Sequence, residues 1–394
     1  MSQRKDYNKT VYACFAGYIV QAVVNNFVPL LFLTFQHQYN IPLSKITMII
    51  TINFGLQLLI DLLSVVIVDR IGYRICTVFA HICAVLGLIL LTILPEIFNS
   101  PFLGILLSVM VYAVGGGLLE VLVSPIVEAC PTDNKEKAMS LLHSFYCWGH
   151  VGVVIFSTLF FTLFGIENWK ILAILWALIP AVNGILFCRV PIAALNAEGE
   201  KGLTLKELMH KKLFWIFVLL MLCAGACEQS VSQWASVFAE KGLGVSKAIG
   251  DLAGPMTFAV LMGLSRAFYG KYGEKINLER FMIYSGILCV ISYLLISLVP
   301  VPVIGLAGCG LCGLSVGILW PGTFSMAAAS VRGGGTAMFA LLALAGDLGC
   351  LAGPGVVGAV SGCLRDNIRM GVLAAIIFPV FLLAGIIGKR GIGV

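Results

Sequence analysis

Long apolar segments separated by short polar turns cover almost the whole of the 394-residue chain. Each segment matches the roughly 20 residues that a helix needs to cross the hydrocarbon core of a bilayer. None alternates with a period of two, so we expect helices rather than the strands of a barrel. Twelve spans are predicted, at residues 11–35, 46–68, 74–94, 102–127, 139–164, 170–189, 213–238, 249–270, 280–299, 302–329, 336–361 and 368–388.

A polar segment at 190–212 divides the spans into two sets of six. We therefore predict an N-terminal six-helix bundle at 1–189, a central cytoplasmic loop at 190–212 and a C-terminal six-helix bundle at 213–394. The two halves resemble weak repeats, because several residues recur in the same order in both. Prolines inside the spans predict kinks; they are Pro29, Pro125, Pro180, Pro255, Pro321, Pro354 and Pro379.

The composition is typical of a membrane protein and argues against a soluble domain or a nucleic-acid-binding protein. Charged residues make up 11% of the chain, against roughly 25% in soluble domains. The net charge of +6 is explained by loop topology, and no basic block with interleaved aromatic residues indicates a nucleic-acid partner. The first apolar run is too long for the core of a cleavable signal peptide.

The distribution of Lys and Arg predicts the orientation. With both termini cytoplasmic, 18 of the 25 basic residues lie in inside segments, six in outside loops and one, Arg266, within a span. Cytoplasmic loops carry such an excess of positive charge. We expect a multi-pass protein of the cell (inner) membrane with both termini in the cytoplasm.

Some short sequence patterns resemble those of enzymes and metal sites, but their positions in the chain do not indicate either function. The glycine patterns at 308–313 and 313–317 lie in one apolar helix and follow no strand. The thirteen Cys lie mostly within spans and are interpreted as small apolar residues. We expect no cofactor, no metal, no catalytic residues and no enzymatic activity.

One carboxylate, Glu120, follows three glycines inside the span at 102–127. An ionisable residue within a span usually faces the bundle interior or a water-filled cavity and is a functional candidate. We expect Glu120 to line a solute pathway and carry a proton; the alternative is a structural carboxylate paired with Arg or Lys. Asp61 shares a helix face with Asn53 and Gln57, at a spacing of four residues, and is a second candidate acid.

Amides and aromatic residues in the spans provide candidate solute contacts. Amides suit sugar hydroxyls because each supplies two donors and an acceptor, although they also join helices to one another. Tryptophan can pack against the apolar face of a sugar or anchor a helix at the interface. The candidates are Gln21, Asn25, Asn26, Asn53, Gln57, Gln229, Gln233, Trp148, Trp234 and Trp320.

His143 shares a helix face with His150 and could relay protons, whereas no third ligand supports a zinc site. Glu228 and Asp347 are further acids within spans. Arg266 is the expected counter-ion for one of these acids, or a side chain that reaches toward the interface.

A short basic turn, Asp69-Arg70-Ile71-Gly72-Tyr73-Arg74, resembles the signature of the major facilitator superfamily, although Val65 stands where the signature has Gly. This resemblance implies twelve transmembrane helices in two pseudo-symmetric six-helix bundles, an all-α integral membrane fold. It also implies gating or structural roles for Asp69, Arg70, Gly72 and Arg74.

Three segments resemble the fucose permease-like group of sugar–proton symporters. Glu120 precedes Ser124-Pro125, His143 precedes the pair that ends at Tyr146, and Glu228 precedes Trp234. The resemblance implies roles for these residues in proton coupling and solute binding. In that group an acid in the first helix takes part in proton transfer, whereas Asn25 and Asn26 occupy the matching region here and cannot titrate.

We expect a secondary active transporter that moves a small polar solute, a sugar or sugar derivative, by proton symport with alternating access. Its partners would be the solute, protons and membrane lipid, and we expect a monomer. Two alternatives are open: a proton-coupled exporter of amphipathic compounds or lipids, and a non-transporting membrane receptor.

Overall fold

A computed structural model describes residues 7–131, 135–193, 203, 205–331 and 335–391. Within this part of the chain every regular element is helical, and twelve segments are long and apolar enough to cross a membrane. The prediction of an all-α, twelve-span membrane protein is confirmed. The chain divides into two compact units: Met1–Lys45 with Ile52–Ala197, and Ile46–Thr51 with Glu198–Val394. Each unit is described by itself.

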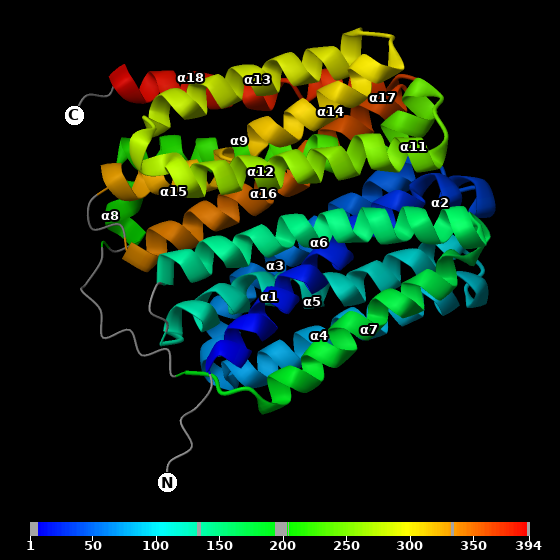
Figure 1. Cartoon of the computed structure of the whole chain (residues 1–394), viewed down its shortest axis with the longest axis horizontal. Coiled ribbons are helices and arrows are strands. Elements are labelled where there is room, and N and C mark those ends of the chain that lie inside the picture. The colour runs from blue at the N-terminus through cyan, green and yellow to red at the C-terminus, as the bar shows by residue number, and fades with distance from the viewer. Residues whose placement is uncertain (1–6, 132–134, 194–202, 204, 332–334, 392–394) are drawn as a thin grey trace. The chain divides into compact units, whose positions relative to one another are not determined.

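The first unit contains seven α-helices and two short 3₁₀ turns among its described residues (Figure 1). The bounds are α1 (Tyr7–Asn26), η1 (Val28–Leu31), α2 (Phe32–Tyr39), α3 (Leu43–Ile71), α4 (Tyr73–Ile97), α5 (Pro101–Ala129), α6 (Lys135–Phe164), η2 (Ile166–Asn168) and α7 (Trp169–Arg189).

The second unit follows the central loop, of which residues 194–202 and 204 lie outside the described part. Its elements are α8 (Leu205–Met209), α9 (Lys212–Ser232), α10 (Ala235–Val237), η3 (Phe238–Gly242), α11 (Lys247–Asp251), η4 (Leu252–Met256), α12 (Thr257–Tyr272), η5 (Gly273–Lys275), α13 (Leu278–Leu298), α14 (Pro302–Val316), α15 (Leu319–Ser330), α16 (Gly335–Cys363), α17 (Ile368–Ala374) and α18 (Ile377–Gly391).

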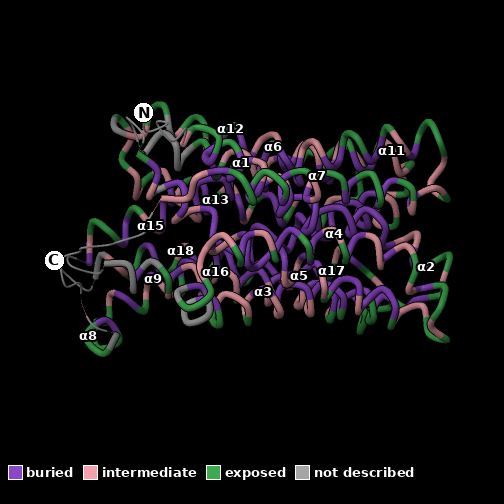
Figure 2. The backbone as a smooth tube through the Cα atoms, turned by 90° about the horizontal axis from the view of Figure 1, so that it is seen from below, coloured by how far each residue is buried: buried purple, intermediate pink, exposed green. Residues whose placement is uncertain are grey.

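One helix lies at the centre of each unit. In the first unit α1 packs against α5, α6 and α7, and in the second α9 packs against α14, α15, α16 and α18. Burial follows this arrangement: 83% of the apolar window of the first span is buried, against 33% in the second span. Figure 2 shows buried residues along the inward faces of the helices and exposed residues at their ends. The polar residues Gln21, Asn25 and Asn26 of α1 and Glu228 and Gln229 of α9 are buried.

Prolines interrupt several spans, because each removes an amide N–H from the helical ladder. Pro29 lies in the 3₁₀ turn η1, Pro255 lies in the π-helical turn η4, and Pro321 follows a non-helical step at residues 317–318. Pro379 follows a similar step at 375–376. The other expected kink sites, Pro125, Pro180 and Pro354, lie inside uninterrupted helices.

Candidate functional site

Buried amides join α1 to α3 in the first unit. Asn25 Oδ1 accepts hydrogen bonds from Gln57 Nε2 at 2.9 Å and from Asn53 Nδ2 at 3.4 Å. All three side chains are buried. Asp61, one turn further along α3, is half-buried. Two α3 amides that share a helix face thus meet a single acceptor on α1.

Glu120 lies beside this amide group. Gln21 Nε2 donates to Glu120 Oε2 at 2.5 Å, and Glu120 is half-buried. The preceding glycines allow α5 to approach three helices. A Cβ atom on Gly115 would lie 2.5 Å from the Ala80 carbonyl oxygen of α4, one on Gly116 would lie 3.0 Å from Val24 of α1, and one on Gly117 would lie 3.1 Å from the Gln57 Cα of α3. Close packing therefore holds the carboxylate against α1.

Two residues that sequence reasoning missed extend this group. Tyr18 Oη and Ser124 Oγ are 3.1 Å apart. Tyr18 lies three residues before Gln21 on α1, and Ser124 lies four residues after Glu120 on α5, so helical spacing places each on the same face as a recognised residue. This helical spacing is the sequence feature from which Tyr18 and Ser124 could have been identified.

Helix α6 supplies the remaining side of the group. Asn26 Nδ2 lies 3.4 Å from Tyr146 Oη, and the His143 and Tyr18 rings are 5.4 Å apart. His143 itself is exposed. Trp148 is also exposed, with a relative exposure of 46%. We call the whole group the first-unit polar cluster; its members are Tyr18, Gln21, Asn25, Asn26, Asn53, Gln57, Glu120, Ser124 and Tyr146.

An ion pair marks the matching region of the second unit. Arg266 Nη2 of α12 lies 3.2 Å from Glu228 Oε2 of α9, and both side chains are largely buried. Gln229 Nε2 donates to Glu228 Oε1 at 3.3 Å, and Gln233 Nε2 donates to Gln229 Oε1 at 3.1 Å. The four residues form a continuous chain of charged and amide groups, which we call the second-unit polar chain.

Arg266 also bonds the backbone where the tenth span breaks. Its Nε donates to the Gly317 carbonyl oxygen at 3.3 Å. In an uninterrupted helix that oxygen would accept from the amide of residue 321, which is Pro321 and has no N–H. The proline thus frees a carbonyl inside a span, and the arginine satisfies it.

The remaining candidates of the second unit lie around α16. The indole Nε1 of Trp234 donates to the Pro354 carbonyl oxygen at 3.1 Å, and Trp234 is fully buried. Trp320 packs against Gly346, where a Cβ atom would meet the indole ring. Asp347, the next residue, is half-buried. The Trp234 indole thus links the turn that follows α9 to the backbone of α16.

The basic turn links the ends of two helices. Arg74 donates to the carbonyl oxygens of Phe187 at 2.7 Å and Val190 at 2.8 Å, at the C-terminus of α7. Helix C-termini leave carbonyls without intrahelical partners and attract cations. Gly72 has φ of +95°, which permits the sharp turn between α3 and α4. Arg70 is exposed, and the Asp69 side chain lies outside the described residues.

Metal binding finds no support within the described residues, where no three His, Cys, Asp or Glu are grouped to hold an ion. The Cys residues are mostly buried, and those described are unbridged.

Comparison with known proteins decides the family. The Major Facilitator Superfamily model matches residues 13–354. The chain belongs to the major facilitator superfamily. It is therefore a multi-pass membrane protein with the fold of a family of transporters, and the resemblance found in the turn at 69–74 is confirmed.

Solved structures share this fold at low identity. The E. coli fucose:proton symporter FucP is 16% identical, with a TM-score of 0.67 over 98% of this chain and 99% of that chain. A bacterial homolog of the human lysosomal transporter Spinster, inward-facing and unoccupied, is 13% identical, with a TM-score of 0.76 over 99% and 98%. At such identities the likeness shows the fold alone. No curated protein matches the chain by sequence.

Proposed function

We propose that the chain is a proton-coupled symporter of a small polyhydroxylated solute, a sugar or sugar derivative. The observation that carries this proposal is the first-unit polar cluster, where a carboxylate is hydrogen-bonded within a group of amides and hydroxyls. Each amide offers donors and an acceptor, the chemistry that recognises vicinal hydroxyls. The same cluster holds a titratable group, Glu120.

The contact between Gln21 and Glu120 can exist in two protonation states. As a carboxylate, Glu120 accepts from Gln21 Nε2. Gln21 Oε1 is buried and has no hydrogen-bond partner among the described residues. A protonated Glu120 could donate to that oxygen and form an acid–amide pair. The amide therefore provides a partner for the acid before and after protonation.

Coupling requires the proton and the solute to favour the same conformation of the transporter. In this proposal Glu120 loads and releases the proton, while amides of the first-unit polar cluster and the second-unit polar chain bind the solute. Transport proceeds by alternating access. We place the protein in the inner membrane with both termini cytoplasmic.

The test is accumulation of solute by Glu120→Gln in proteoliposomes with an imposed proton gradient. Glutamine keeps hydrogen bonds and loses the proton, so we expect gradient-driven accumulation to be lost while solute exchange persists. Glu167→Gln, an exposed carboxylate of the same unit, is the control. Wild-type accumulation by Glu120→Gln would refute the proton role.

The solute itself can be found by thermal-shift screening of the purified protein with monosaccharides, sugar acids and polyols at acid and neutral pH. A ligand that binds the folded state raises its apparent stability by mass action. A pH-dependent shift with one sugar would support symport. Shifts with amphipathic compounds alone would contradict the sugar assignment and favour an exporter.

A further inference from the structure

A groove runs along the outer surface of the second unit between α12, α13 and α14. Its walls include Leu264 and Phe268 of α12, Tyr284 and Ser285 of α13, and Leu314 of α14. The cavity has a volume of about 390 Å³, within the range of roughly 300–1,000 Å³ found for small-ligand sites. All the lining side chains are apolar, aromatic or hydroxylic.

The apolar walls of this groove are open to the outside of the unit. Leu264 is 48% exposed, Phe268 47% and Tyr284 67%. These residues belong to membrane spans, so the medium beside them is hydrocarbon. An acyl chain is therefore the apolar group that can enter the groove.

Basic residues continue both walls at one end of the groove. Lys271 lies three residues after Phe268 on α12, and Arg280 lies four residues before Tyr284 on α13, so each follows its wall along one helix face. Lys275 lies in the turn between the helices, and all three are exposed. The adjacent spans end at Tyr269 and begin at Leu278, which places these charges at headgroup level.

The described surroundings of these cations contain no paired carboxylate. Among the side chains that the structure describes, which exclude Glu274, none of the three forms an ion pair with a carboxylate. The nearest described acid on α13, Glu279, pairs with Lys389 at 3.0 Å. Lys271 Nζ lies 5.2 Å from the centroid of the Tyr272 ring.

We propose that this groove and its basic end form a binding site for one anionic phospholipid. One acyl chain occupies the groove between Leu264 and Tyr284, and the phosphate lies between Lys271 and Arg280. Basic groups at headgroup level attract anionic lipids, and a guanidinium can bond a phosphate through two N–H groups. The site is separate from the solute pathway and does not depend on the proposed solute.

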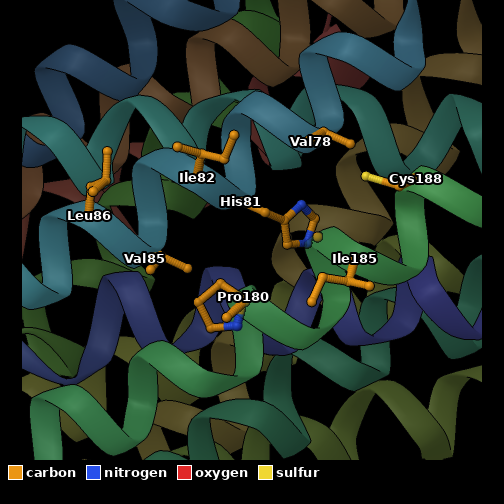
Figure 3. A pocket seen from close by; sticks show the side chains of 10 residues that line it. Val78, His81, Ile82, Val85, Leu86, Pro180, Ile185 and Cys188 are labelled. Atoms are coloured by element: carbon orange, nitrogen blue, oxygen red, sulfur yellow. The ribbon is translucent and has the colours of Figure 1, made fainter.

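The first unit also contains an apolar groove. It lies between α4 and α7, is smaller, at about 240 Å³, and is lined by His81, Val85, Pro180 and Ile185 (Figure 3). Arg74, at the start of α4, donates to two main-chain carbonyls. An apolar groove is thus present in both units. Beside the first groove one exposed cation, Arg189, follows Ile185 along α7, whereas three exposed cations lie at the end of the second groove.

Native mass spectrometry of the full-length protein tests the proposal. The purified protein is titrated with dioleoyl phosphatidylglycerol and, separately, with dioleoyl phosphatidylcholine, which has the same chains and no net charge. Each basic side chain at the membrane surface contributes roughly fivefold in affinity. We expect the double variant Lys271→Gln/Arg280→Gln to bind phosphatidylglycerol about 25-fold more weakly and phosphatidylcholine as the wild type does.

Two further variants separate the contributions. Leu264→Trp fills the groove from its exposed wall and should weaken both lipids. The control Lys206→Gln/Lys211→Gln removes two exposed charges elsewhere and should leave both affinities unchanged. Equal binding of the two lipids by the wild type, or unchanged phosphatidylglycerol binding by Lys271→Gln/Arg280→Gln, would overturn the proposal.

Discussion

At the scale of single residues, Arg266 contacts two acceptors inside the second unit. It bonds the Glu228 carboxylate and the carbonyl oxygen that Pro321 leaves free. Sequence alone identified Arg266 as a counter-ion without indicating which acid it meets. Spacing along one helix cannot identify a partner on another helix, because that depends on how the helices pack.

The Glu228–Arg266 pair gives a first prediction. Removing one member of a buried ion pair leaves an uncompensated charge and destabilises by about 3–5 kcal/mol. We expect Glu228→Gln alone to lower the thermal midpoint more than the double variant Glu228→Gln/Arg266→Gln does. Thermal unfolding in detergent measures both. Additive losses in the double variant would show that the two side chains are not coupled.

Glu240 gives a prediction about pH. Burial raises the pKa of Glu240; Lys247, 3.3 Å away, lowers the pKa, and Asp251 raises it again. An acid with a raised pKa binds its proton more tightly in the folded protein, so its contribution to stability is lost as pH rises through the folded pKa. We expect the thermal midpoint to rise as the pH is lowered from neutral toward the ordinary carboxyl pKa, and Glu240→Gln to reduce that rise.

Glu167→Gln serves as the control for this pH series, because Glu167 is exposed. A rise of the same size in Glu240→Gln and wild type would assign the pH dependence to other groups.

At the scale of helices, the spans were largely predictable from apolar length, and their interruptions were predictable only where a proline marks them. The seventh span was expected to run to residue 238, but its helix ends at Ser232 and a turn at residues 233–234 follows. The first span is broken at η1, where Pro29 predicts a kink. Hydropathy measures transfer to lipid and is unaffected by whether the backbone is regular, so the break at residues 233–234, which no proline marks, leaves no hydropathy signal.

Close packing of α9 and α16 gives a prediction for two glycines of one helix. A Cβ atom on Gly349 would collide with the Leu222 carbonyl oxygen of α9, whereas nothing lies within 4 Å of one on Gly362. Overpacking costs about 1–3 kcal/mol, and alanine favours helix over glycine by about 1 kcal/mol. We expect Gly349→Ala to lower the thermal midpoint and Gly362→Ala to leave it equal or higher. The reverse order would contradict the packing seen here.

At the scale of the whole molecule, the sequence predicted the superfamily from twelve spans and one basic turn. The function-bearing contacts were only partly predictable. The shared face of Asn53 and Gln57 followed from helical spacing, but their common acceptor, Asn25, lies on another helix. Contacts between helices depend on tertiary packing, which one sequence does not specify by spacing.

Topology gives the prediction at this scale. The distribution of Lys and Arg predicts that both termini lie in the cytoplasm. We expect green fluorescent protein fused after residue 394 to fluoresce, and alkaline phosphatase inserted at residues 299–302 to be active. Active phosphatase at the C-terminus would reverse the assigned orientation.

The ion pair between α9 and α12 also constrains how the chain enters the membrane during synthesis. Glu228 leaves the ribosome before Arg266, and a charged residue at the centre of an isolated span opposes insertion by about 2.5–3.5 kcal/mol. Helix α9 therefore acquires its compensating charge only when α12 has emerged. We therefore expect the insertion of α9 to be more favourable when α12 is present than when the chain ends before it.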